Sequence, residues 1–508
     1  MEKLDLKEQN RQWIYLKDWN CYKLEKMVYC ENPKVPQEQS MNIYAPAEYL
    51  DPDGTVREKE SKNGYTARTA PVIFENGLAG YKEAEPFELD DERSMGVEAV
   101  LNGFVYVSCG CRGRSSRNEK GVLCGKAPVS VADLKAGIRF LKRNAKILPG
   151  NMEHIISVGI SAGGAMSTLL GCTGDNKDYE EELKAMGADF TQSDSVFGAQ
   201  CYCPITDLDH ADMAYEWMFE GQTHYTGMPF LGFGEGKLTP FCQALSKEMG
   251  KKYVEYFNSL KLKHPKTGEI LTIENGHGGN GSIYLKEQLE KSAEKYIVKT
   301  PDGQAKLSGY SWLSITENLV DNKKNSANIR HAGEYKVIIS SLEDMEKDYH
   351  KRLKLCPAFD DLNLIQAENQ EFGTEHTDKR HFNTKLAGIM ENLKKEFPEE
   401  TTNYLSGYQE ICEDKELKRQ KRLLNPLNYI DITEENLSDS NINKLAPHYR
   451  IRVGAKDADT SLTVTMILAL KLMETKRIDV DYEIVWDERH GRADYPGEMV
   501  NWVKRICK

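Results

Sequence analysis

The chain has 508 residues, 40% of them hydrophobic and 29% charged, which is typical of a folded globular protein and argues against disorder. A formal net charge of −12, with no long block of lysine and arginine, argues against a nucleic-acid partner. There is no secretion signal at the N-terminus and no apolar run of about eighteen residues, so we expect a cytoplasmic protein without a membrane partner.

The first part of the chain alternates strand-like and helix-like segments. Apolar, β-branched runs bounded by turn residues predict strands over residues 40–44, 71–80 (ending in a glycine-containing loop), 104–109, 154–160 and 196–204. Helices are expected between them, over 91–101 and from Ser130, where Asp133 gives a capping-box-like start. This order of strands and helices predicts a parallel sheet with right-handed crossovers.

Two loops at the ends of these strands carry candidate functional groups. Gly77 lacks a Cβ and so allows the backbone to approach a substrate closely, which makes its N–H a candidate oxyanion donor; the alternative is that Asn76-Gly77 is simply a turn. The loop Arg112-Gly113-Arg114 could bind an anion, but we favour arginines that hold the loop by hydrogen bonds to carbonyl groups.

The segment Gly159-Ile160-Ser161-Ala162-Gly163 joins an apolar strand to a run of small, helix-compatible residues. This is the pattern of a nucleophile elbow, in which glycine-sized neighbours allow a tight turn to present a serine above the sheet. We therefore predict that Ser161 is a nucleophile and that the Ala162 N–H, at the start of the helix, is an oxyanion donor.

From residue 209 to residue 424 the alternation of strand and helix is lost. Charged, helix-like stretches such as 284–297 and 342–355 take over. The glycine-containing segment 276–281 lacks the Lys-Ser/Thr ending and the preceding apolar strand of a phosphate-binding loop. We expect a mainly helical insertion that forms a lid above the carboxyl edge of the sheet.

The sheet pattern returns near the end of the chain. Strands are expected over 449–457 and 479–486, with a helix over 460–475 between them and a closing amphipathic helix. Asp457 and His490 each follow one of these strands, so they should lie at the same sheet edge as Ser161. The order serine, aspartate, histidine is that of the α/β-hydrolases, and it favours Asp457 over other nearby carboxylates as the triad acid.

These elements predict an α/β-hydrolase fold with a mostly parallel central sheet. The core would comprise residues 1–208 and 425–508, interrupted by the insertion 209–424. We expect no metal or other cofactor, because the spacing within Cys-x-Cys pairs such as Cys109/Cys111 and Cys201/Cys203 does not suit zinc, and we expect the twelve cysteines to be reduced thiols.

With these motifs the chain resembles the bacterial tannases, relatives of the feruloyl esterases. The resemblance spans nearly the whole length and is carried by Phe74-Glu75-Asn76-Gly77, Arg112-Gly113-Arg114, Gly159-Ile160-Ser161-Ala162-Gly163-Gly164-Ala165, Gly454-Ala455-Lys456-Asp457-Ala458-Asp459-Thr460 and His490. It implies that Asp459, Lys354 and Glu368 bind the three phenolic hydroxyls of a galloyl group.

The expected function is that of a serine carboxylic ester hydrolase that releases gallic acid from a small phenolic ester. A feruloyl or other aryl esterase and a proline-specific serine peptidase remain alternatives on the same fold. A non-catalytic binding module is disfavoured by the intact triad. The sequence does not give the oligomeric state.

Overall fold

The structure is a computed structural model that describes residues 4–9, 12–91, 94–227, 234–318, 334–430, 444–475 and 477–508. Residues 1–3, on which the expectation about the N-terminus partly rests, lie outside these ranges. No helix within them has both the length and the apolar character needed to cross a bilayer. All twelve cysteines are described, and all are free thiols in this structure.

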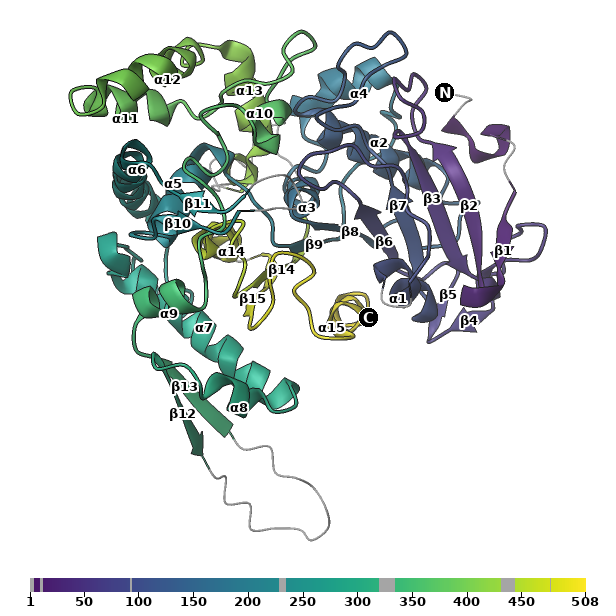
Figure 1. The fold of residues 1–508 in the computed structure, drawn as a ribbon. Helices are drawn as coiled ribbons and strands as arrows, with labels where there is room; N and C mark the ends of the chain where they lie inside the picture. The colour runs from purple at the N-terminus through teal and green to yellow at the C-terminus, as the bar shows by residue number, and fades with distance from the viewer. Residues whose placement is uncertain are drawn as a thin grey trace.

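A nine-stranded sheet forms the centre of the described part of the molecule, in the order β1-β2-β3-β7-β6-β8-β9-β14-β15 (Figure 1). From β7 to β15 all neighbours are parallel, whereas β1, β2 and β3 pair antiparallel at one edge. The mostly parallel α/β fold is confirmed. The strands are β1 Ile14–Leu16, β2 Cys21–Val28, β3 Ser40–Pro46, β6 Val72–Asn76, β7 Val105–Cys109, β8 Ile155–Ile160, β9 Gly198–Tyr202, β14 His448–Gly454 and β15 Asp479–Val485, with a small separate hairpin of β4 Ser61–Lys62 and β5 Tyr65–Thr66.

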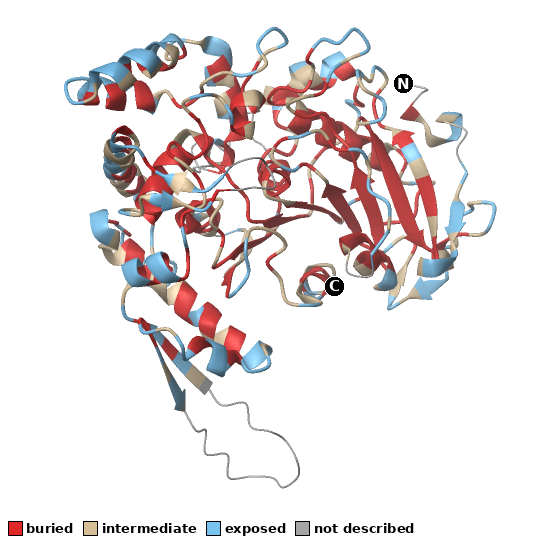
Figure 2. Cartoon of the chain, in the orientation of Figure 1, coloured by how far each residue is buried: buried red, intermediate tan, exposed pale blue. Residues whose placement is uncertain are grey.

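Helices cover both faces of the sheet, and the central strands are buried throughout (Figure 2). One face packs on α1 (Met95–Leu101) and α15 (Glu498–Ile506), whose apolar residues form a cluster with side chains of β6, β7 and β8. The other face packs on α2 (Val129–Arg143), α3 (Ala162–Cys172) and α14 (Leu462–Glu474) in a larger cluster. Burial of both faces explains why these strands are continuous apolar runs in the sequence.

The predicted capping box at Ser130 and Asp133 is wrong. Helix α2 begins at Val129 after Pro128 and has no side-chain cap. The Asp133 carboxylate instead accepts hydrogen bonds from the Arg112 guanidinium, at 2.7 and 2.9 Å, and from Gln39 at 3.0 Å, while its side chain is fully buried. A buried arginine needs such a partner, and this need outweighs the local capping preference.

A long insertion separates β9 from β14; its first helix, α5, begins at Leu208, and its last α-helix, α13, ends at Leu424. The domain limits of 209 and 424 stay a prediction. In Figure 1 it lies on the side of the molecule away from β1. Its described helices are α5 Leu208–Met218, α6 Pro240–Ser259, α7 Asn280–Lys299, α8 Gly303–Leu307, α9 Leu342–Asp348, α10 Ala367–Glu371, α11 Lys385–Leu393, α12 Pro398–Glu410 and α13 Lys415–Leu424.

The insertion is mainly helical, as expected, but it also holds two hairpins that the sequence did not predict. They are β10 (His224–Tyr225) with β11 (Gly236–Lys237), and β12 (Leu313–Asn318) with β13 (Glu334–Ile339). The helix expected over 342–355 is shorter, because α9 ends at Asp348. Lys354 therefore lies in a loop, whereas Glu368 lies in α10.

Candidate active site

Ser161 lies in a strained turn between β8 and α3. Its backbone angles, φ 60° and ψ −122°, fall where residues other than glycine are rare. A Cβ on Gly159 would come within 2.2 Å of the Gly163 carbonyl oxygen, and one on Gly163 within 2.7 Å of Asn76 Oδ1. Gly159 is thus needed for the close passage of strand and helix, as the elbow pattern predicts, and Gly163 is needed for the close approach of Asn76 at the end of β6.

The structure brings Ser161, His490 and Asp457 together in one hydrogen-bonded line. His490 Nε2 is 2.7 Å from Ser161 Oγ, and His490 Nδ1 is 2.7 Å from Asp457 Oδ2. The other oxygen of Asp457 accepts the Asp459 backbone N–H at 3.0 Å. Three residues separated by up to 329 positions in sequence therefore have the spacing that proton transfer from a serine hydroxyl requires.

The electrostatics of the histidine suit a base paired with a buried acid. Burial alone would lower the pKa of His490, but the neighbouring Asp457 carboxylate and Cys203 together outweigh burial and raise that pKa well above the ordinary 6.5. Asp457 is fully buried, so its charge acts on the imidazole with little screening by water. An imidazolium formed during attack by Ser161 would be stabilised at this position.

Cys203 is a neighbour of His490 that the sequence analysis did not single out for this site. It follows β9, and its Sγ lies 3.8 Å from His490 Nε2 and donates to the Gly491 carbonyl at 3.4 Å. Ligand atoms of Cys203, Asp457 and His490 lie within 4.8 Å of one another, close enough to hold a metal ion; this is the one such group among the described residues. Two of these three side chains already bond to each other.

The amino end of α3 and the loop after β6 face each other at the elbow. The Asn76 amide donates to the carbonyls of Val158, at 3.2 Å, and Gly163, at 3.1 Å, and the Leu78 carbonyl accepts the Gly163 N–H at 2.9 Å. These bonds hold the Gly77 loop against the elbow that carries Ala162. Asn76 is a further residue that the sequence analysis treated only as part of a turn.

Lys354, Glu368 and Asp459 form a charged cluster next to the triad acid. Lys354 Nζ is 3.7 Å from Asp459 Oδ1 and lies 4.1 Å from the centre of the Phe359 ring. Burial raises the pKa of Glu368, and the nearby Lys354 ammonium opposes that rise. Lys354 and Glu368 are buried, and Asp459 is partly exposed. The structure therefore brings together the three residues that the resemblance assigned to a phenolic ring.

Tyr215 on α5 connects this cluster to the triad loop. Its hydroxyl accepts the backbone N–H groups of Leu353 at 3.0 Å and Lys354 at 2.9 Å, and donates to the Ala458 carbonyl at 3.1 Å. The loop of the insertion that carries Lys354 is thus fixed relative to the loop that carries Asp457. Nothing in the local sequence around Tyr215 indicates this role, because all its partners are distant in the chain.

A second histidine and carboxylate contact the triad acid from behind. His350 Nε2 makes a short hydrogen bond to the Asp457 backbone carbonyl, and His350 Nδ1 lies 2.8 Å from Glu346 Oε2. Both side chains are at most 2% exposed. Burial lowers the pKa of His350, but Glu346 and Asp457 together outweigh that effect and raise the pKa above 6.5, with Glu346 contributing more. Because both ring nitrogens face acceptors, the arrangement fits a buried imidazolium.

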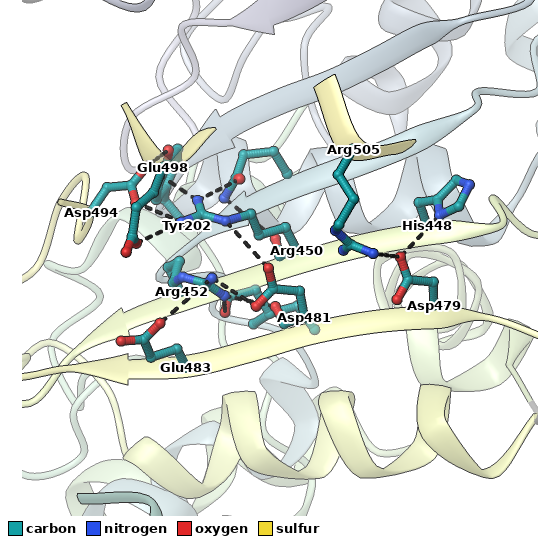
Figure 3. A network of polar contacts seen from close by, with 12 residues as sticks. Tyr202, His448, Arg450, Arg452, Asp479, Asp481, Glu483, Asp494, Glu498 and Arg505 are labelled. Carbon is teal, nitrogen blue, oxygen red and sulfur yellow. Dashed lines mark hydrogen bonds and ion pairs between the residues drawn. The ribbon is translucent and has the colours of Figure 1, made fainter. Parts of the chain in front are cut away.

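The loop that carries His490 is anchored on its other side by a buried ionic network (Figure 3). Arg450 on β14 is 1% exposed; its Nη2 lies 2.6 Å from Asp494 Oδ1, and Tyr202 donates to Asp494 Oδ2 at 2.7 Å. Arg452, two residues further along β14, pairs with Asp481 at 2.7 Å. The network fixes Asp494, four residues after His490, against the sheet.

The Arg112-Gly113-Arg114 loop is held by its own arginines, as favoured above. Arg112 donates to the Cys124 carbonyl at 3.1 Å and pairs with Asp133, and Arg114 donates to the Gly80 carbonyl at 2.8 Å. The Arg114 bond ties the loop after β7 to the loop after β6, and the Arg112 bonds hold the loop after β7 against α2.

Comparison with known proteins gives similar chains for the whole length. The family model BD-FAE matches residues 77–230. A solved tannase from Fusobacterium nucleatum is 29% identical, covering 99% of each chain with a TM-score of 0.79. A tannin acyl hydrolase from Lactobacillus plantarum is 29% identical, covering 98% of this chain and 97% of its own, with a TM-score of 0.78. A tannin acyl hydrolase in complex with ethyl gallate is 28% identical, covering 100% of this chain and 99% of its own, with a TM-score of 0.79. No curated protein sequence matches the chain.

Proposed function

Because the chain resembles bacterial tannases in structure over its whole length, we propose that it is a serine carboxylic ester hydrolase that cleaves galloyl esters and releases gallic acid. The observation that carries the proposal is the pairing of a hydrogen-bonded Ser161–His490–Asp457 line with a charged cluster of Lys354, Glu368 and Asp459 beside it.

In this mechanism Ser161 Oγ attacks the ester carbonyl carbon while His490 Nε2 takes the hydroxyl proton. The developing oxyanion would accept hydrogen bonds from the backbone N–H groups of Ala162 and Gly77. Collapse of the tetrahedral intermediate breaks the bond to the alcohol oxygen, and His490 returns its proton to that oxygen. Water then attacks the acyl-enzyme by the same route, with Asp457 orienting the imidazole throughout.

The acyl group would be selected by the charged cluster. A galloyl ring carries three adjacent hydroxyls in one plane, and each can donate to a carboxylate or accept from an ammonium group. A site built to bond hydroxyls rejects rings that lack them far more strongly than an apolar pocket does, because its buried polar groups are then left unpaired. Lys354 and Glu368 come from the insertion, which we propose acts as a lid over the site.

Ester hydrolysis with three acyl groups tests the proposal. We expect the protein to prefer methyl gallate to methyl ferulate and methyl benzoate, and Ser161→Ala to abolish activity on all three. Hydrolysis of all three esters at similar kcat/KM would retain the serine mechanism and favour a general aryl esterase. Absence of any ester hydrolysis would favour the peptidase or a binding module.

Two substitutions examine the acyl site separately. Asp459→Asn and Glu368→Gln should each lower kcat/KM for methyl gallate by about tenfold or more, because each removes one hydrogen bond to a charged group. Each should also reduce the ratio of kcat/KM for methyl gallate over methyl benzoate. Glu375→Gln is the matched control, because Glu375 lies seven residues after Glu368 and its side chain is 65% exposed. An unchanged gallate preference in both variants would refute the galloyl assignment.

A further inference from the structure

Three segments of the chain meet behind the charged cluster: the Gly77 loop after β6, the loop after β7, and helix α10 of the insertion. The Lys126 ammonium, from the loop after β7, donates to the Gln370 carbonyl of α10 at 2.8 Å. A Cβ on Gly80, in the Gly77 loop, would lie 3.7 Å from the Ala367 Cβ at the start of α10. The helix that carries Glu368 is therefore in direct contact with both loops.

Tyr81, four residues after Gly77, places its hydroxyl group in this junction. The residue is 3% exposed, and its hydroxyl makes no hydrogen bond to the described part of the chain. Burial raises the pKa of Tyr81, and the carboxylates of Glu368 and Glu371 raise that pKa further. Because the effect of a charge falls with distance, the Tyr81 hydroxyl lies near both carboxyl groups.

The backbone of Tyr81 is strained and is fixed by its neighbours. Its φ of 58° lies in the left-handed region, which residues other than glycine rarely adopt. The Arg114 backbone N–H donates to the Tyr81 carbonyl at 2.7 Å, and the Arg114 guanidinium donates to the Gly80 carbonyl at 2.8 Å. A strained residue that its surroundings hold in place is typical of catalytic and ligand-binding sites.

Glu371 is a second polar group in this junction without a partner in the protein. Its side chain is fully buried, and neither carboxyl oxygen has a hydrogen-bond partner among the residues that the structure describes. Burial raises the pKa of Glu371 well above 4.5, although the charges of Lys126 and Arg114 oppose that rise. Buried polar groups nearly always have a partner, so a carboxyl group of this kind indicates a place where a polar molecule binds.

The Tyr81 hydroxyl lies on the Glu368 side of the charged cluster. The charges that act on Tyr81 are those of Glu368 and Glu371, whereas Asp459, which does not act on it, pairs with Lys354 at 3.7 Å. A ring hydroxyl that donates its proton to the Glu368 carboxylate keeps two lone pairs on its oxygen. A tyrosine hydroxyl beside Glu368 can therefore donate to the same ring oxygen.

We propose that Tyr81 is a fourth residue that binds the acyl group, with its hydroxyl donating to the ring hydroxyl that Glu368 accepts. The proposal rests on the galloyl esterase function above. Because Tyr81 belongs to the Gly77 loop, this bond would connect the acyl ring to the loop that binds the oxyanion. The ring would then be held from two sides, by Glu368 of the insertion and by Tyr81 of the sheet domain.

Tyr81→Phe removes the hydroxyl and keeps the ring that fills the junction. We expect KM for methyl gallate to rise about threefold to tenfold, the cost of one neutral hydrogen bond, with kcat nearly unchanged. Both constants for methyl benzoate should keep their native values, because that ring has no hydroxyl, and this activity also shows that the variant is folded. Tyr284→Phe in α7 is the matched control, since Tyr284 is also buried and its hydroxyl has no partner among the described groups.

A double-mutant cycle locates the bond on the ring. If Tyr81 and Glu368 bind the same ring hydroxyl, the loss in kcat/KM caused by Tyr81→Phe should be at least twofold smaller in Glu368→Gln than in the native protein. In Asp459→Asn, which affects the other side of the cluster, Tyr81→Phe should cause the same loss as in the native protein. Equal losses in all three backgrounds would refute a shared ring hydroxyl.

The outcomes separate this inference from the function on which it rests. If the native protein prefers methyl gallate to methyl benzoate and Tyr81→Phe has the native KM for both, the role of Tyr81 is refuted and the galloyl esterase stands. An equal fall in kcat for both esters also refutes it, because Tyr81 would then act only by shaping the Gly77 loop. If the native protein cleaves neither ester, the proposed function fails, and the role of Tyr81 fails with it.

Discussion

Replacing Glu346 by glutamine tests whether His350 carries a positive charge behind the triad. In the native protein His350 faces two acceptors, the Glu346 carboxylate and the Asp457 carbonyl. Glutamine keeps the shape of the side chain but removes the charge that holds the pKa of His350 up against burial. Because only Asp457 would then oppose burial, we expect the pKa of His350 to fall and the histidine to lose its proton at a lower pH than in the native protein.

The expected loss is that of the charge-assisted hydrogen bond between Glu346 and His350, which is also part of what raises the pKa of His350. A hydrogen bond to a charged group contributes about 1.5–3 kcal/mol. We therefore expect Glu346→Gln to lower the free energy of unfolding at pH 6 by the same amount, ~1.5–3 kcal/mol.

The sign of the pH dependence follows from the direction of the shift. A histidine whose pKa is higher in the folded than in the unfolded chain stabilises the fold fully below pH 6.5, and this stabilisation is lost as the pH rises through the folded-state pKa. The difference in stability between the native protein and Glu346→Gln should therefore shrink as the pH increases from 6 to 9.

Urea unfolding at pH 6, 7, 8 and 9 measures this difference, and kcat/KM for methyl gallate measures its effect on the triad. We expect kcat/KM to fall about tenfold, equivalent to about 1.4 kcal/mol, as Asp457 loses its support, with little change in KM. Glu343→Gln, on the exposed side of the same helix, is the control. Stability curves that stay parallel from pH 6 to pH 9 would show that His350 is uncharged and that this reasoning is wrong.

Four further outcomes follow from the geometry. Gly159→Ala should destabilise the fold by about 3 kcal/mol and remove activity, because its Cβ would meet the Gly163 carbonyl at 2.2 Å; thermal unfolding and ester turnover check this. Tyr215→Phe should raise KM for methyl gallate about tenfold and leave KM for methyl benzoate nearly unchanged, since the Tyr215 hydroxyl fixes the loop that carries Lys354. Steady-state kinetics with both esters measure this, and an equal rise in the two KM values would contradict it. The acidic limb of the pH profile of kcat/KM should have its midpoint above pH 6.5, because His490 has a raised pKa and must lose a proton before it can act as a base. A midpoint below pH 6.5 would exclude His490 as the base with a raised pKa. Zn²⁺ or Cd²⁺ should inhibit ester hydrolysis reversibly by bridging Cys203 and His490, and a chelator should restore activity. Cys203→Ala should weaken this inhibition about tenfold or more. Equal inhibition of the native protein and the variant would show that the metal binds elsewhere.

The strands and the meeting of Ser161, His490 and Asp457 could be predicted because each depends on a local pattern. The elbow at Ser161 needs small residues at fixed spacing, which gives a recognisable motif. The parallel strands are buried on both faces, so they are continuous apolar runs in the sequence. Asp457 and His490 each follow a strand of the same parallel sheet, and this topology brings them to one edge.

The support around the triad could not be predicted, because its bonds join distant parts of the chain. His350 reaches Asp457 across 107 positions and Tyr215 reaches Ala458 across 243. Neither residue stands in a pattern that distinguishes it from an ordinary helix or loop residue. The false capping box at Ser130 has the same cause, since the partner of Asp133 lies 21 residues away in a separate loop.

The position of the insertion between two paired strands also governs how the chain folds. β9 and β14 are parallel neighbours, and residues such as Gln200 and Arg450 that meet across them are 250 positions apart. Closing so long a loop costs only about 2 kcal/mol more than closing one a tenth as long, since the entropy grows with the logarithm of length. Pairings of this range are nevertheless slow to form, and Ser161 cannot meet Asp457 until they have formed. A refolding chain should therefore regain its helices well before it regains turnover, and the lag between the two reports the moment at which β14 joins the sheet.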